Sequence, residues 1–186
     1  MVKLSKWLNN RITGWFALIS LVIFLLFTAF VLPSQASEAE IYSGAIGSPD
    51  TSLYYSAEQL YKFAESYGPE GRAAYVRARL TFDIIFPLVY TLFLTSAISW
   101  LTKNIPLTGR FWQRSNLVPI LGMLFDFLEN AATATVMVRY PNPTPILATL
   151  AGFFTVIKWI FVGGSFFILV AAGLLGILRL ITKKQS

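Results

Sequence analysis

The sequence predicts an all-α bundle of four transmembrane helices, and three observations lead to this fold class. First, 55% of the 186 residues are hydrophobic and only 13% are charged, with a mean hydropathy of +0.62. Second, several apolar runs reach the length of about 20 residues that a helix needs to cross a hydrocarbon layer. Third, the basic residues gather in alternate segments between these runs, as in multi-pass proteins. We therefore expect a single membrane domain over residues 1–186.

The four runs cover approximately residues 13–32, 80–101, 117–138 and 146–181. Helices are the expected structure, because backbone groups in lipid must be hydrogen-bonded within the segment and the runs are too long and unbroken for barrel strands. The first run contains few polar residues, which predicts a place at the periphery of the bundle. The chain has neither cysteine nor histidine, which excludes disulfides and the usual zinc and haem ligands. We expect no metal or other cofactor.

The distribution of basic residues predicts that both termini face the cytoplasm. These residues lie before the first run, after the second run and at the carboxyl terminus: Lys3, Lys6, Arg11, Lys103, Arg110, Arg114, Arg179, Lys183 and Lys184. Four tryptophans fall near the same predicted interface, whereas most tyrosines fall outside. The lipid bilayer is thus the expected partner. Nucleic acid is not, because no basic groove-binding element stands outside the apolar runs.

The first run also permits a competing interpretation. Three basic residues, an apolar stretch and then Ser34-Gln35-Ala36 resemble a signal peptide with small residues at its cleavage positions. The run is longer than the usual apolar region of about 7–15 residues, which favours a membrane helix. Cleavage would leave three helices in the same orientation.

Residues 33–78 are expected to form an extracytoplasmic connector. Its first part, up to Asp50, has no clear period and predicts an irregular chain. Ser56 and Gln59 have the spacing of a capping box, which predicts a short helix near residues 57–67. Pro69 suits the first turn of a further helix. The second transmembrane helix should therefore project outward by two or three turns.

The third run carries the least expected polar residues. Asp126, Glu129, Asn130 and Thr133 fall within about 100° of helical arc, near the middle of the run. Two neighbouring carboxylates do not both ionise easily in a low dielectric unless a cation intervenes. Such pairs suit proton transfer or acid/base chemistry. Alternatively, these side chains hold helices together by hydrogen bonds.

The second and fourth runs supply possible partners for these acids. Arg79 and Asp83 are spaced i, i+4 and can pair, with Tyr75 and Tyr90 on the same face. Lys158 either extends to the outer interface or pairs with Glu129 or Asp83. The candidate functional cluster comprises Asp126, Glu129, Asn130, Asp83, Arg79 and Lys158, with Tyr75, Tyr90, Thr133 and Thr155 as secondary members.

Three strings carry a resemblance to a known group of proteins. They are Gly68-Pro69-Glu70-Gly71-Arg72, Asp126-Phe127-Leu128-Glu129-Asn130 and Phe154-Thr155-Val156-Ile157-Lys158-Trp159. Together they resemble small bacterial four-helix membrane proteins that have no assigned activity. The resemblance covers most of the chain after Ser52, and it implies the architecture and a bacterial inner membrane rather than a chemistry. A looser similarity to sterol-isomerase-type proteins carries no function over, because the histidines are missing.

Three functions remain open from the sequence. The first, and the one we favour, is proton-coupled or small-solute transport, in which the acids of the third run titrate. The second is a membrane enzyme that acts on a lipid or isoprenoid by acid/base chemistry, with Lys158 or Arg79 holding an anionic head group. The third is an accessory or structural subunit, in a homo-oligomer or a larger membrane complex.

Overall fold

The computed structural model describes residues 2–105 and 109–183, so Lys184, one of the predicted basic residues, lies outside the described part. Within these ranges the chain is helical and has no strand. The α-helices are α1 (Val2–Arg11), α2 (Gly14–Leu26), α3 (Leu32–Ser43), α4 (Ala57–Ser66), α5 (Gly68–Leu80), α6 (Phe82–Asn104), α7 (Val118–Arg139) and α8 (Pro145–Lys183).

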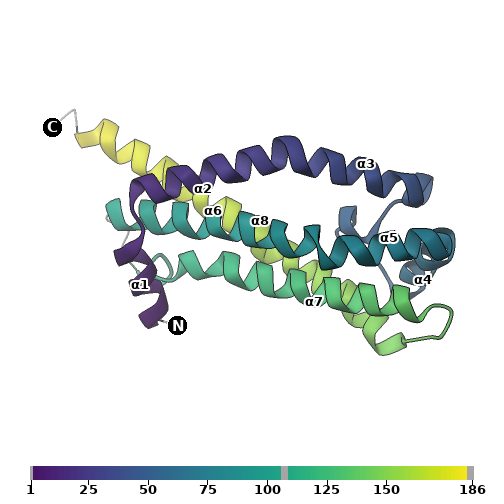
Figure 1. Cartoon of the computed structure of the whole chain (residues 1–186). Coiled ribbons are helices and arrows are strands. Elements are labelled where there is room, and N and C mark those ends of the chain that lie inside the picture. Colours follow the sequence, from purple (N-terminus) through teal and green to yellow (C-terminus); the bar gives the residue numbers. More distant parts are fainter. Residues whose placement is uncertain (1, 106–108, 184–186) are drawn as a thin grey trace.

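Four stretches of this helical chain are long and apolar enough to cross a membrane: Gly14–Ser43, Gly68–Asn104, Ser115–Arg139 and Pro145–Arg179. They cover nearly all of the four predicted runs, which confirms the predicted all-α membrane helix bundle. Both termini lie at one end of the bundle, here called the terminus end (Figure 1). The opposite end, here called the cap end, holds α4, α5 and the turn between α7 and α8.

The first spanning helix is longer than predicted, and the expectation of an irregular chain from residue 33 was wrong. A π-helical turn, Phe27–Val31, joins α2 to α3, which continues to Ser43. Pro33 lies in the first turn of α3, where a helix tolerates the missing N–H. The residues that come after it are mostly Ala, Gln, Glu and Ser, and the first three favour helix. The helix ends at Gly44, whose φ is +50°.

The cap end contains the predicted short helix. Ser56 Oγ accepts the Gln59 backbone N–H at 3.2 Å, and the Gln59 side chain accepts the Ser56 N–H at 2.8 Å, so the capping box is formed. Helix α5 begins at Gly68 and supplies the predicted projection of the second spanning helix. It is separated from α6 at Thr81, whose backbone leaves the helical region. The predicted connector is thus largely helical.

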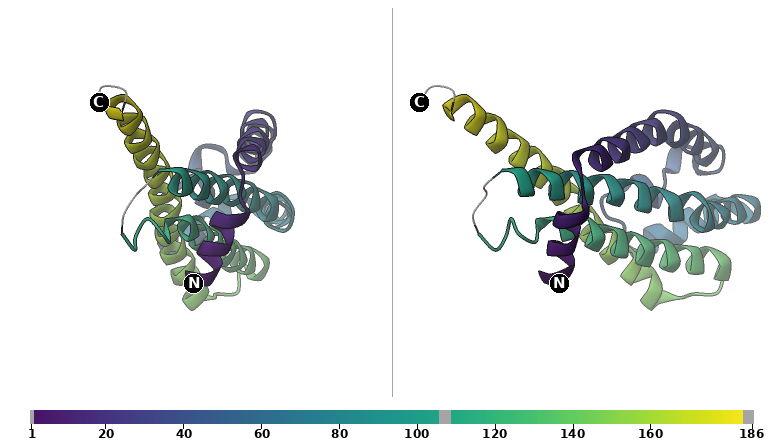
Figure 2. Two further views of the ribbon diagram at one scale, coloured as in Figure 1. Left: turned by 90° about the vertical axis from the view of Figure 1, so that its left-hand side faces the viewer. Right: turned by 60° about the vertical axis from the view of Figure 1, so that its left-hand side comes forward.

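The main apolar core lies at the cap end. Tyr55, Leu60 and Tyr75 are buried there against α7 and α8, where Val136 and Ala148 are also buried. Toward the terminus end α8 leans away from the other helices (Figure 2). Most of its exposed side chains in that part are apolar and include Phe167, Val170 and Ile177, as expected of a lipid-facing surface. A second, smaller cluster of buried residues, formed by Tyr90, Phe93 and Leu94, lies on α6.

Candidate functional site

An ion pair between α7 and α8 forms the deepest part of the site. Lys158 Nζ lies 2.6 Å from Glu129 Oε2 and 3.8 Å from Asp126 Oδ1. Both members of the closer pair are buried, with 7% of Lys158 and 2% of Glu129 exposed. Of the two alternatives for Lys158, the structure therefore has the one in which it pairs with Glu129.

The other carboxylate oxygen of Glu129 accepts hydrogen bonds from two hydroxyl groups. Thr155 Oγ1 donates to Glu129 Oε1 at 2.7 Å and Tyr55 OH donates to the same atom at 3.1 Å. Burial and the neighbouring Glu129 carboxylate raise the pKa of Tyr55 well above its ordinary value. Tyr55 is therefore a neutral phenol that donates, and it ties the segment before α4 to the interior of the bundle.

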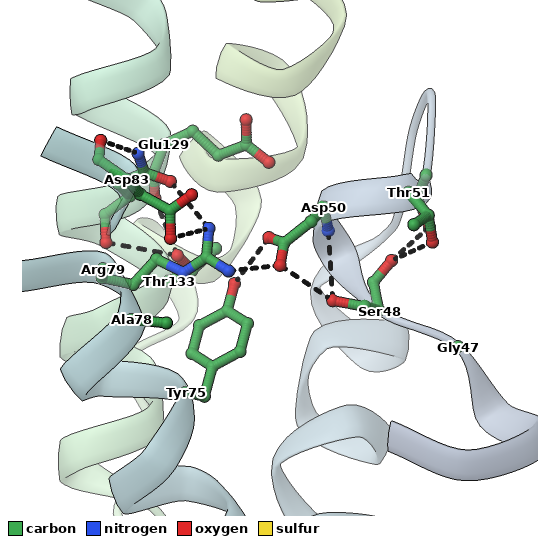
Figure 3. Close-up of polar contacts among 12 residues, drawn as sticks. Gly47, Ser48, Asp50, Thr51, Tyr75, Ala78, Arg79, Asp83, Glu129 and Thr133 are labelled. Atoms are coloured by element: carbon green, nitrogen blue, oxygen red, sulfur yellow. Dashed lines mark hydrogen bonds and ion pairs between the residues drawn. The ribbon is translucent and has the colours of Figure 1, made fainter. Parts of the chain in front are cut away.

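A second group surrounds Arg79 at the end of α5 (Figure 3). Arg79 Nη1 lies 3.0 Å from Asp83 Oδ2, which confirms the predicted i, i+4 pair although the helix breaks between them. The same nitrogen donates to Asn130 Oδ1 at 3.2 Å. Its other terminal nitrogen pairs with Asp50, and the guanidinium stands 4.2 Å from the centre of the Tyr75 ring. Arg79 in α5 thus contacts α6, α7 and the segment that contains Asp50.

Asn130 and Asp126 connect the two groups. Asn130 Nδ2 donates at 3.3 Å both to Asp126 Oδ1 and to the backbone carbonyl of Asp83. Tyr90 OH donates to Asp126 Oδ2 at 3.1 Å. Polar contacts therefore run without interruption from Asp50 to Glu129, and this set of residues is called the charge network below.

Asp50 is the most exposed charged member of the charge network. It lies in a 3-10 turn, Pro49–Thr51, and 33% of its side chain is exposed. Its backbone N–H donates to Ser48 Oγ at 3.3 Å, and Tyr75 OH donates to its Oδ1 at 3.4 Å (Figure 3). Asp50 therefore marks the place where the network meets the surface of the cap.

All ten predicted site residues come together in this region. Six of them form the polar contacts described above: Asp126, Glu129, Asn130, Asp83, Arg79 and Lys158. Tyr75, Tyr90 and Thr155 each donate to a carboxylate of the network, and Thr133 Oγ1 donates to the Glu129 carbonyl at 3.0 Å. Sequence reasoning missed Asp50 and Tyr55, because one was counted among the acids of the connector and the other among the tyrosines outside the runs.

The charges of the network do not balance. Four carboxylates, those of Asp50, Asp83, Asp126 and Glu129, contact two cations, Arg79 and Lys158. Full ionisation would leave an excess of two negative charges in or near the hydrocarbon layer, which is costly. Among the described residues, no three acids lie close enough together to hold a metal ion.

Two surface grooves lie away from the charge network. One, of about 600 Å³, lies between α2, α6 and α8, and the other, of about 460 Å³, lies between α1, α2, α6 and α7. Neither is lined by a residue of the network.

Comparisons with protein-family models, with curated proteins and with solved structures found no match to the chain.

Proposed function

We propose that the chain is a small proton-coupled or small-solute transporter whose charge network takes up protons from the cap side. The observation that carries this proposal is the excess of two carboxylates over cations in one continuous set of polar contacts. Because a single four-helix unit is small for alternating access, we propose that it works as an oligomer or as a simple pore.

The proposal includes an orientation. The basic residues at the terminus end favour the cytoplasmic side for that end, which makes the cap extracytoplasmic. The resemblance to small bacterial membrane proteins favours a bacterial inner membrane. Protons would then enter at the part-exposed Asp50 and reach the interior from outside the cell.

The chemistry that we propose is an exchange of ion pairs. The Arg79 guanidinium keeps its charge in proteins, so it acts as a fixed counter-charge rather than as a proton carrier. A proton on Glu129 would weaken the pair with Lys158, whose ammonium group already lies 3.8 Å from Asp126. Lys158 would then move toward Asp126. Protonation is thereby linked to a rearrangement between α7 and α8.

The direct test is proton flux into liposomes that contain the purified protein and an internal pH-sensitive dye. We expect flux above that of empty liposomes, and we expect Asp126→Asn combined with Glu129→Gln to remove it. Glu65→Gln, on the exposed face of α4, is the matched control and should not change it. If the double variant, still folded and inserted, kept the full flux, the transport proposal would be wrong.

A structural or accessory role is the second candidate, and one observation favours it. Every charged group of the network has a charged partner within 4 Å. Contacts of this kind hold helices together in membrane proteins even where they have no further function. In that case the double acid-to-amide variant would lower protein abundance, the purified wild type would show no flux, and a partner would co-purify in mild detergent.

The third hypothesis, a membrane enzyme that acts on a lipid or isoprenoid, requires a groove that reaches Asp126 or Glu129. Neither of the two grooves described above reaches them.

A further inference from the structure

Helix α1 lies across the terminus end of the bundle and does not run along the spanning helices (Figure 1). The anchor is Asn116, which is buried. Its Nδ2 donates to Asn9 Oδ1 and to Ser99 Oγ, both at 2.9 Å, while its Oδ1 accepts from Ser5 Oγ at 2.7 Å. These bonds connect α1 to α6 and to the segment before α7.

The groove of about 460 Å³ lies beside this fastened helix. Its walls come from α1, α2, α6 and α7 and are largely apolar, with Trp7, Phe16, Leu88 and Met123 among them. A groove of this kind at the membrane surface is suited to an apolar chain. The charge network does not line this groove, so a ligand bound there is independent of the proposed function.

Two polar groups of the groove are left without partners. Arg11 is exposed, and in the described part of the chain no carboxylate forms an ion pair with it. Only 7% of Thr95 is exposed, and its hydroxyl has no hydrogen-bond partner among the described residues. Ser96 and Thr102 on the same helix instead donate to the backbone carbonyls of the preceding turn. The Thr95 hydroxyl oxygen is buried, so Arg11 is the unpartnered polar group that a ligand in the groove can reach.

We propose that this groove binds one anionic phospholipid. An acyl chain lies along the apolar walls, and the phosphate pairs with Arg11. Charge selects the occupant, because α1 carries three basic residues and no acidic one, and basic residues at a membrane surface attract anionic lipids. Arginine also suits a phosphate through paired N–H donors.

The test compares phosphatidylglycerol with phosphatidylcholine by native mass spectrometry of the delipidated, full-length protein in detergent. We expect the wild type to retain one phosphatidylglycerol in preference to phosphatidylcholine. Arg11→Gln should weaken phosphatidylglycerol binding about fivefold and leave phosphatidylcholine unchanged. Lys6→Gln is the matched control: Lys6 is exposed on the same helix and does not line the groove, so this change should have little effect.

Two further experiments distinguish lipid binding in the groove from non-specific attraction of lipid to the protein. Leu88→Trp should fill the groove and weaken the binding of both lipids, and millimolar inorganic phosphate should not displace phosphatidylglycerol. Equal losses in Arg11→Gln and Lys6→Gln, or no loss in a folded Leu88→Trp variant, would overturn the site. Displacement by phosphate alone would show an anion site without a lipid chain and would also overturn it.

Discussion

Lys158 is the only basic group that contacts Glu129 and Asp126 in the described part of the chain. Lys158→Met would leave two buried carboxylates without a cation. We expect the free energy of unfolding to fall by about 3–5 kcal/mol, measured by thermal unfolding in detergent. Lys62→Met is the control. Lys62 pairs at the exposed surface with Glu58, and this change should cost less than about 1 kcal/mol.

The same ion pair predicts that a second substitution restores stability to the Lys158→Met variant. Glu129→Gln added to Lys158→Met removes the uncompensated charge, so the double variant should recover a large part of the lost stability, because breaking a buried pair costs more than replacing both partners. If the two changes simply added, the electrostatic account of this pair would be wrong.

Tyr55 offers a second test at a single residue. Tyr55→Phe removes one donor to the Glu129 carboxylate and leaves the ring in place. We expect a loss of about 1.5–3 kcal/mol in unfolding free energy, as for other hydrogen bonds to a charged group. Tyr54→Phe, at a neighbouring side chain that is 63% exposed, should be neutral. Equal effects of the two changes would contradict the assigned contact.

Residues of the charge network differ in how well their contacts can be predicted from sequence. The pair Arg79–Asp83 and the shared face of Asp126 and Glu129 are given by helical spacing, which is local. The contacts of Asp50 and Tyr55 depend on how the segment before α4 folds back over α7 and α8. No local pattern specifies that packing, and neither residue lies within an apolar run.

At the scale of elements, the segment before α4 packs closely against α8 at Gly152. A Cβ added at Gly152 would lie 2.1 Å from the Tyr55 carbonyl oxygen. Gly152→Ala must therefore push the segment before α4 away from α8, and we expect a cost of about 1–3 kcal/mol in thermal unfolding. Gly163→Ala, also in α8, meets no neighbouring atom within 4 Å. That control should be neutral or slightly stabilising, and an equal loss in both variants would contradict the packing.

The elements themselves show where sequence reasoning succeeds and where it fails. The apolar runs predict α6, α7 and α8 closely, because length and apolar character are properties of the segment alone. Helix α3 was missed because Pro33 and the Ser and Gly residues after it indicate a loop. The helix continues through a π-helical turn before Pro33, and no residue pattern predicts that turn.

At the scale of the whole molecule, the two ends of the bundle should lie on opposite sides of the membrane. The chain has no cysteine, so single cysteines can report each side. We expect Glu65→Cys, at the cap end, to react with a membrane-impermeant maleimide on intact cells. Asn10→Cys, at the terminus end, should react only after lysis. The opposite pattern would reverse the orientation and place the entrance of the charge network in the cytoplasm.

The central claim is that the charge network holds protons because its carboxylates outnumber its cations. At pH 7 exposed Asp and Glu are ionised, since their ordinary pKa values are about 4. The C=O stretching band of protonated carboxyl groups in the infrared spectrum therefore reports the buried acids. We predict this band in the wild type at pH 7 and an undiminished band in Glu65→Gln. The band should weaken when Asp126→Asn is combined with Glu129→Gln, and a part should remain because Asp50 and Asp83 still share the one cation Arg79. A wild-type spectrum without the band at pH 7 would contradict the claim.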